Sequence, residues 1–308
     1  MNRSNIATPR ARAGLPMRVA RWLAGLTAAL ALTLATVTGC QVNPATGQQQ
    51  FNVLSEAEEV RIGEQAVPEF LAQYGGELPS PEVVNHVREL GHKLARASER
   101  PDLPWEFHVV DSDVVNAFAL PGGKVFVTRG MLEQLENEAQ LAAVLGHEIG
   151  HVTAQHVGQQ MSRQIGLEAG LAAIGLAVGQ SESQWLQVLG VGAEVGGGLY
   201  LLQFSRQQEL EADQLGMRYM TRVNYNPVGA LQLLQILKRE SQGEPLEFLS
   251  THPLPQTRID AVEGRIREDY PDYDRPQRYR FARDRYQTQM LQPLRELPPP
   301  AHRPQQAR

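Results

Sequence analysis

The spacing of apolar and polar residues predicts a chain built mainly from helices. One helix is expected to begin at Pro81, with Ser80 as its cap, because an apolar stripe follows at helical intervals: Val84, Val87, Leu90 and Leu94. An earlier helix is expected to begin near Glu56, since Ser55 and Glu58 have the spacing of a capping box.

Strand-like composition replaces this pattern between residues 105 and 128. Residues 105–110 resemble a strand, and segments 114–120 and 124–128 flank a Pro-Gly-Gly turn, which predicts a hairpin. Helical composition returns over residues 137–160 and in three later segments: 204–223, 226–241 and 249–269. The predicted fold class is therefore α+β, a mainly helical domain with a small sheet or hairpin beside the helix of residues 137–160.

Residues 165–204 are apolar and rich in glycine. Their first apolar run is too short to cross a bilayer, which needs about 20 apolar residues. The second run contains Gln187, Glu194 and three consecutive glycines, which suit a spanning helix poorly. A packed helical hairpin is the favoured interpretation, and contact with a membrane surface is the alternative.

The first 39 residues have the organisation of a bacterial lipoprotein signal peptide. Five arginines precede an uncharged apolar run, and the run ends at Thr-Gly-Cys. Cys40 is the only cysteine in the chain, and its setting resembles a lipobox, so we expect it to carry lipid. Gln41 follows it, which favours the periplasmic side of the outer membrane; soluble periplasm or the inner membrane are the alternatives. A retained membrane anchor, or a start at Met17, also stays open.

The remaining chain divides into three expected parts. Residues 40–55 are polar and turn-rich and are expected to be a tether, residues 56–270 a catalytic domain, and residues 271–308 a disordered tail rich in proline and arginine. The formal charge is −5 and becomes −10 once residues 1–39 and their five arginines are removed. No basic stripe is visible, so binding to nucleic acid is not expected.

The segment His147-Glu148-Ile149-Gly150-His151 has the His-Glu-x-x-His spacing of a zinc peptidase. On a helix, His147 and His151 point to one side, one turn apart, and can bind one Zn²⁺. Glu148 lies beside the metal position without occupying it, which suits a general base. Gly146 and Gly150 would let another element approach this helix closely.

A catalytic zinc needs a third protein ligand. His156 lies about half a turn away from His147 on a continuous helix, so it is expected to be structural. The metzincin pattern fails, because Ala154 and Val157 stand where it needs glycine and histidine. Glu209 and Asp213 share a helix face and could supply a ligand and its orienting partner. An acidic, solvated helix face is the alternative at this point.

The combined motifs resemble the HtpX-like family of zinc metallopeptidases, closest to its periplasmic and lipoprotein members of the BepA and LoiP types. The similarity covers most of residues 43–266 and rests on five segments: residues 43–65, 115–132, 147–151, 205–213 and 250–259. The transmembrane helices of HtpX and of the prenyl proteases have no counterpart here. The helical-repeat domain of the BepA type is also not expected.

The resemblance implies one Zn²⁺ held by His147, His151 and Glu209, with Glu148 as the general base. Asp213 would orient a ligand or donate a proton. His252 matches a histidine that can approach the open position on the metal and restrain activity. A loop histidine beside Pro253 is the alternative for His252.

A zinc endopeptidase that hydrolyses unfolded or misassembled envelope proteins is the expected function. Substrate would lie along an edge strand within residues 114–120 or 124–128. Asn116, Ala117 and Phe118 are the candidate contacts, with core packing as the alternative for Phe118. A non-catalytic or gated envelope chaperone that uses the same groove is the competing hypothesis. A purely structural zinc is disfavoured, because such sites are usually rich in cysteine.

Overall fold

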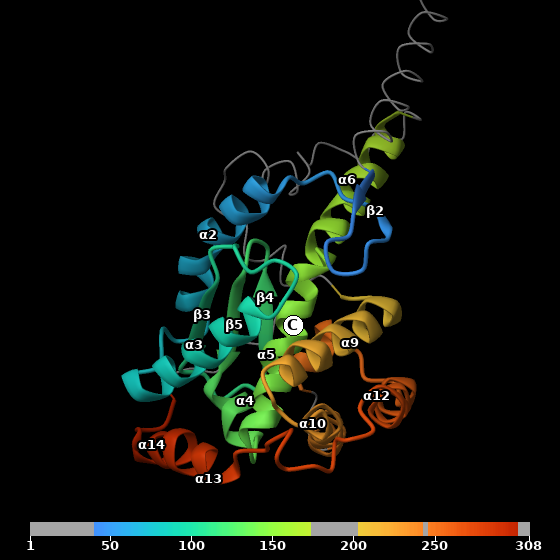
Figure 1. Cartoon of the computed structure of the whole chain (residues 1–308). Coiled ribbons are helices and arrows are strands. Elements are labelled where there is room, and N and C mark those ends of the chain that lie inside the picture. The colour runs from blue at the N-terminus through green and yellow to red at the C-terminus, as the bar shows by residue number, and fades with distance from the viewer. Residues whose placement is uncertain (1–39, 174–202, 243–245, 301–308) are drawn as a thin grey trace, which may run out of the picture.

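The computed structural model describes residues 40–173, 203–242 and 246–300 (Figure 1). The expected signal peptide, residues 1–39, lies outside the described residues. The same holds for residues 174–202, which are most of the apolar segment 165–204. Among the described residues, none of the helices combines the length and apolarity that crossing a bilayer requires.

A three-stranded sheet forms where strands were expected. It contains β3 (Glu106–Val110), β4 (Ala117–Leu120) and β5 (Lys124–Thr128) in the order β3-β5-β4. The predicted hairpin is confirmed: β4 runs antiparallel to β5, and β3 runs parallel to it. Because β5 is the central strand, residues 124–128 cannot offer an edge to a substrate, so that alternative is wrong. β4 is an edge strand.

Two helices precede this sheet. α2 (Glu56–Gln73) begins with the predicted capping box, in which Ser55 and Glu58 bond reciprocally. α3 (Pro81–Arg96) begins at Pro81 with Ser80 at its N-cap position, as predicted, although the Ser80 side chain makes no capping hydrogen bond.

Helix α5 (Glu138–Thr153) lies at the centre of the molecule, and every one of its residues is buried. It lies between the sheet on one side and α9 (Arg206–Arg222) and α10 (Val228–Glu240) on the other (Figure 1). Glycines allow α5 and α9 to touch through their backbones. A Cβ added at Gly146 would lie 3.0 Å from the Gly216 oxygen, and one at Gly150 would lie 3.0 Å from the Ala212 oxygen. The predicted close approach is confirmed.

Four further helices connect these elements or follow them. α4 (Arg129–Gln134) follows the sheet, and α6 (His156–Ala173) leaves α5 after a sharp corner. α11 (Phe248–Thr251) and α12 (Gln256–Asp269) follow α10.

Residues 40–55 are not a free tether, so that expectation is wrong. β1 (Cys40–Val42) and β2 (Gln49–Phe51) pair into a hairpin. Between and after the strands, four side chains are buried against the body of the protein: Asn43, Ala45, Asn52 and Leu54. The polar composition of the segment suggested exposure, but both asparagines have hydrogen-bond partners in the body of the protein. Asn43 donates to the carbonyl of Ala154 after α5, and Asn52 accepts from Ser162 in α6.

The expectation of a disordered tail is wrong for residues 271–300. They form α13 (Arg283–Tyr286), a π-helical turn η1 (Gln287–Leu291) and α14 (Gln292–Glu296). The average composition concealed an apolar stripe that joins the main core: Tyr286, Met290, Leu291 and Leu294. Buried Arg129 secures this segment by donating to the carbonyls of Leu294 and Pro298.

Candidate metal centre

Four side chains from three parts of the chain converge beside α5. His147 and His151 come from α5, Glu209 from α9, and His252 from the residue after α11. One ligand atom from each lies within 4.8 Å of all the others. All four are at most 4% exposed. The acidic-face alternative for Glu209 is therefore wrong, since this carboxylate is fully buried against two histidines.

The spacing of these donor atoms fits a tetrahedral zinc ion. Bonds of about 2.0–2.1 Å in a tetrahedron place neighbouring ligand atoms roughly 3.3 Å apart. His147 Nε2 lies 3.1 Å from His151 Nε2 and 3.3 Å from His252 Nδ1. The Glu209 oxygens lie 3.6, 3.4 and 3.0 Å from the donors of His147, His151 and His252. Nitrogen and carboxylate donors are also the types that zinc prefers.

Glu148 lies next to this group, with Oε1 3.7 Å from His252 Nε2. The carboxylate is 1% exposed, and Oε1 has no hydrogen-bond partner among the described residues. Burial raises the pKa of Glu148 above its ordinary value. A buried carboxylate with an unsatisfied oxygen is costly for folding, so its presence here indicates a chemical role.

Asp213 and Arg258 support His147 from behind. Asp213 Oδ1 lies 3.0 Å from His147 Nδ1, and Arg258 donates two 2.8 Å bonds to the same carboxylate. Burial opposes the charged forms, but the guanidinium and His147 lower the pKa of Asp213, and Asp213 and Glu209 raise the pKa of His147. Sequence reasoning placed Asp213 but missed Arg258, although Arg258 lies in the segment 250–259 that carries the resemblance.

His156 contacts His151 on the side away from the other donors. Its Nδ1 lies 2.9 Å from His151 Nδ1, and it is not a member of the four-residue group. The expectation that it does not join the metal agrees with this arrangement, but the reason given was wrong. α5 does not continue past Thr153; Gln155 adopts φ +56°, and α6 begins at His156.

Comparison with known proteins identifies this centre. The model of peptidase family M48 matches residues 81–266, which include all four converging side chains. The chain belongs to peptidase family M48. The prediction of a zinc metallopeptidase family is confirmed, and zinc is the metal that this family and this donor set imply.

Several curated relatives share this similarity. The mitochondrial metalloendopeptidase OMA1 of Schizosaccharomyces pombe is 35% identical over 71% of this chain and 64% of its own length. The beta-barrel assembly-enhancing protease of Escherichia coli is 28% identical over 74% of this chain and 48% of its own. Metalloendopeptidase OMA1 of Danio rerio is 32% identical, with 73% and 50% covered. The chain thus spans about half to two thirds of the length of these relatives.

Aromatic side chains cover the group of His147, His151, Glu209 and His252, which we call the M48 centre. The ring of Phe204 lies 3.9 Å from that of His151, and Phe248 stacks on His252 at 4.5 Å. Phe204 and Phe248 are themselves 8% and 2% exposed. The centre is therefore enclosed in this structure.

The candidate substrate residues lie at the start of the edge strand. Asn116 is buried and donates to Glu247 Oε1 at 2.8 Å, and the Ala117 side chain is buried in the main core. The Phe118 ring packs against Phe126 and two further rings, those of Phe70 and Tyr74. The Phe118 side chain is partly buried and packs against the core, which agrees with the alternative given for it.

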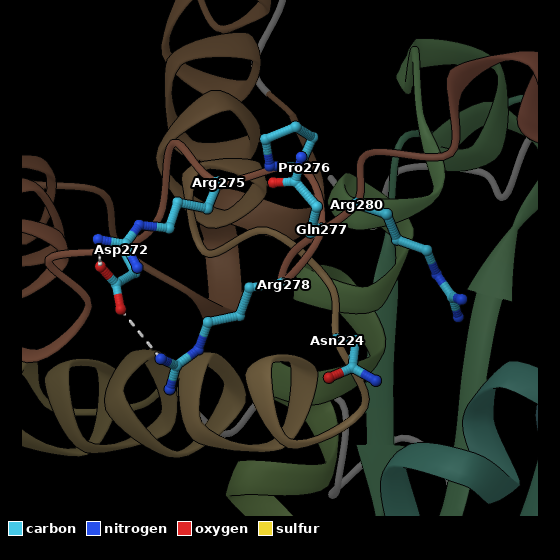
Figure 2. A pocket seen from close by; sticks show the side chains of 7 residues that line it. All are labelled: Asn224, Asp272, Arg275, Pro276, Gln277, Arg278 and Arg280. Atoms are coloured by element: carbon cyan, nitrogen blue, oxygen red, sulfur yellow. Dashed lines mark hydrogen bonds and ion pairs between the residues drawn. The ribbon is translucent and has the colours of Figure 1, made fainter.

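A cavity of about 610 Å³ lies elsewhere, along residues 272–280 and beside Asn224. Figure 2 shows Arg275 and Arg278 reaching Asp272 from two sides, while Arg280 points away from them. Arg280 instead lies over the Tyr225 ring, 4.6 Å from its centroid. Volume alone would direct attention here, but none of the M48 centre's residues lines this cavity.

Proposed function

We propose that this chain is a zinc-dependent endopeptidase that cleaves unfolded or misassembled proteins of the bacterial cell envelope. The observation that carries the proposal is the pairing of a zinc-type donor group with a buried, unsatisfied carboxylate at Glu148. Membership of family M48 supports it independently.

The proposed ligands are His147, His151 and Glu209. Bound zinc would polarise the scissile carbonyl and make water more acidic. Glu148 would then take a proton from the attacking water and pass it to the departing amine as the peptide bond breaks. Its raised pKa suits this exchange, because burial brings the proton affinity of the carboxylate closer to the working pH.

Asp213 is proposed to orient His147 rather than to bind metal. By accepting a hydrogen bond from Nδ1–H, it fixes the tautomer that presents Nε2 to the other donors. Arg258 neutralises part of the carboxylate charge and keeps Asp213 ionised. A proton-donating role for Asp213 has less support, because its pKa is lowered and its oxygens are already engaged.

His252 is proposed to hold the enzyme in a latent state. Its Nδ1 lies 3.3 Å from His147 Nε2 and 3.0 Å from Glu209 Oε1, so His252 would be a fourth protein donor beside a metal held by the other three residues. Catalytic zinc sites keep one position open, whereas fully liganded sites are inert. Movement of His252 and of its neighbour Phe248 would open that position. The loop-histidine alternative fits the burial of His252 less well, since the residue is 1% exposed.

Substrate is proposed to add a strand to the outer edge of β4. The Thr128 N–H donates to the Asn116 carbonyl. In an antiparallel ladder, alternate residues bond to the neighbouring strand, so the N–H and C=O groups of Ala117 and Ala119 point away from β5. Such pairing reads backbone rather than side chains, which suits unfolded polypeptides of varied sequence.

The proposed location is the periplasmic side of the outer membrane, anchored through lipid on Cys40. Support comes from the signal-like residues 1–39, from the exposed free thiol of Cys40, and from similarity to a bacterial protease named for β-barrel assembly. The similarity to mitochondrial OMA1 proteins supports the peptidase activity but not this location.

Proteolysis of an unfolded protein such as casein tests the catalytic proposal. The chain is purified without lipid, its zinc content is measured, and Glu148→Gln and His252→Ala are compared with the unchanged chain. We expect Glu148→Gln to keep zinc and lose cleavage by a factor of about 10²–10⁴. His252→Ala should cleave faster than the unchanged chain.

The competing hypothesis is a chaperone that binds clients in the same groove without cleaving them. Suppression of aggregation that is equal in the unchanged chain and in Glu148→Gln, with no cleavage by either or by His252→Ala, would favour the chaperone. A folded chain that binds no zinc would refute the proposed mechanism.

A further inference from the structure

His156, the first residue of α6, has no role in the proposed mechanism. It lies between the metal centre and the hairpin of β1 and β2, which we call the N-terminal hairpin. Its ring is 1% exposed and faces His151, which is also 1% exposed, across a 2.9 Å contact between the two Nδ1 atoms. A buried histidine with no part in catalysis is unusual unless another buried group needs it.

Hydrogen-bond chemistry sets the direction of this contact. His151 Nε2 points at the other ligand atoms, so a metal-binding His151 must carry its proton on Nδ1. Only one of the two facing Nδ1 atoms can hold a proton. His156 therefore accepts at Nδ1 and carries its own proton on Nε2. That nitrogen lies 3.8 Å from the Glu211 carboxylate, an electrostatic contact that is longer than a hydrogen bond.

Glu211 is in turn held by the hairpin. Asn43 Nδ2 donates to Glu211 Oε1 at 3.0 Å and lies 3.4 Å from the carbonyl of Ala154, at the end of α5. Asn43 is itself fixed, because its Oδ1 accepts from the backbone N–H groups of Ala45 and Thr46.

A second set of contacts braces the same corner. Gln50 Nε2 donates to Gln155 Oε1 at 2.6 Å, and Gln159 Nε2 donates to Gln50 Oε1 at 2.8 Å. Gln155 is the residue whose left-handed backbone turns the chain from α5 into α6. The hairpin thus forms hydrogen bonds both to Gln155, at the corner that precedes His156, and to Glu211, whose carboxylate lies near His156.

We propose that Asn43, Glu211 and His156 form a positioning chain that holds His151 in its metal-binding orientation, so that the N-terminal hairpin is a working part of the zinc site. The inference rests on the proposed ligation of zinc by His151. Partners that orient a metal-binding histidine typically contribute 10- to 100-fold to metal affinity. If Cys40 carries lipid, the lipid is attached only three residues before Asn43, the first member of this set of positioning residues.

Zinc affinity, measured by competition with a chromogenic chelator, tests the proposal without depending on cleavage. The unlipidated chain is compared with His156→Ala, His156→Asn, Asn43→Ala and the matched control Thr46→Ala. Thr46 is exposed on the same hairpin, and the backbone N–H that it gives to Asn43 survives the change. Thermal unfolding of each metal-free variant verifies that it folds.

We expect His156→Ala to weaken zinc binding by about 10- to 100-fold. His156→Asn should recover part of this loss, because its side-chain oxygen can still accept from His151 Nδ1. Asn43→Ala should weaken binding roughly threefold to tenfold, as the more distant member of the chain, and Thr46→Ala should leave it unchanged.

Two results would overturn the inference while leaving the peptidase proposal intact. One is a folded His156→Ala or His156→Asn variant that binds zinc as tightly as the unchanged chain, which would make His156 merely structural. The other is Asn43→Ala behaving like Thr46→Ala, which would separate the hairpin from the site. An unchanged chain that binds no zinc would refute both proposals together.

Discussion

The metal centre and the arginine-lined cavity differ in how their charges are balanced. At the centre, the carboxylates of Glu148 and Glu209 are buried, that of Asp213 is 9% exposed, and among the described residues the guanidinium of Arg258 is the cation paired with two of them. Metal ligation requires neutral histidines and ionised carboxylates. In that state these four groups carry two net negative charges, which a divalent cation would cancel. At the cavity, two arginines share one acid, and their side chains are 68% and 60% exposed.

Cavity volume and the balance of buried charge therefore point to different parts of this protein. Water screens the exposed arginines, so their charges need no ligand. Buried carboxylates have no such solvent, and the cost of leaving them unbalanced is large. An uncompensated buried charge therefore marks the functional site more clearly than open space does.

The largest contrast should come from removing one carboxylate in each region. Glu209→Gln should lower casein cleavage about a thousandfold or more, because loss of the metal removes several kcal/mol of transition-state stabilisation. Asp272→Asn should change the rate less than about twofold, since the Asp272 carboxylate pairs with two exposed arginines, Arg275 and Arg278. Initial cleavage rates measure both, and comparable losses would remove the distinction between the regions.

Removal of the metal should lower the stability of the protein only where the metal ligands are intact. At a zinc concentration about a thousand times the dissociation constant, bound metal stabilises the folded state by about 4 kcal/mol. A chelator should therefore lower the melting temperature of the unchanged chain and of Asp272→Asn equally. Glu209→Gln should respond far less. A melting temperature insensitive to chelator in the unchanged chain would contradict the charge-balance argument.

Asp213 should make the stability of the metal-free protein depend on pH in the acid range. Its pKa is lowered, since Arg258 and His147 outweigh the effect of burial. A lowered pKa in the folded state means stability that is present above the ordinary value of 3.8 and lost as the pH falls through the lower folded value.

Asp213→Asn should therefore cost about 2 kcal/mol of unfolding free energy at neutral pH. The difference in unfolding free energy between the two proteins should shrink as the pH falls below 3.8. Urea unfolding in chelator at several pH values measures this gap. A gap independent of pH would assign the loss to packing instead of charge.

The smallest effect is expected from the exposed arginines. The double change Arg275→Ala and Arg278→Ala should alter unfolding free energy by at most about 1 kcal/mol, because exposed ion pairs contribute little. Casein cleavage should stay unchanged. A large loss of cleavage with intact folding would show that the cavity takes part in function, and the comparison would then need revision.

Local patterns anticipated much of the fold. The capping box at Ser55, the start of α3 at Pro81 and the hairpin around Pro121–Gly123 depend on residues close in sequence, and all three form as predicted. The prediction of disorder for residues 271–300 was wrong because their structure depends on residues distant in sequence. Their proline and arginine content indicated disorder, while the surface that buries Tyr286 and Met290 is supplied by distant helices.

The sequence by itself determined the metal chemistry, because the spacing of His147, Glu148 and His151 on one helix needs no distant partner to be meaningful. The spacing of the motif left the third ligand open. The resemblance implied Glu209, and only the tertiary structure brings that acid to the site. Glu209 reaches it because glycines let α5 and α9 touch.

The enclosing and supporting residues were likewise decided by packing. His252 lies 105 residues from His147 in sequence, and Arg258 and Asn43 are equally remote from the motif. Spacing along a chain constrains neighbours on one element, whereas burial brings together groups whose charges and hydrogen bonds can be satisfied only by each other.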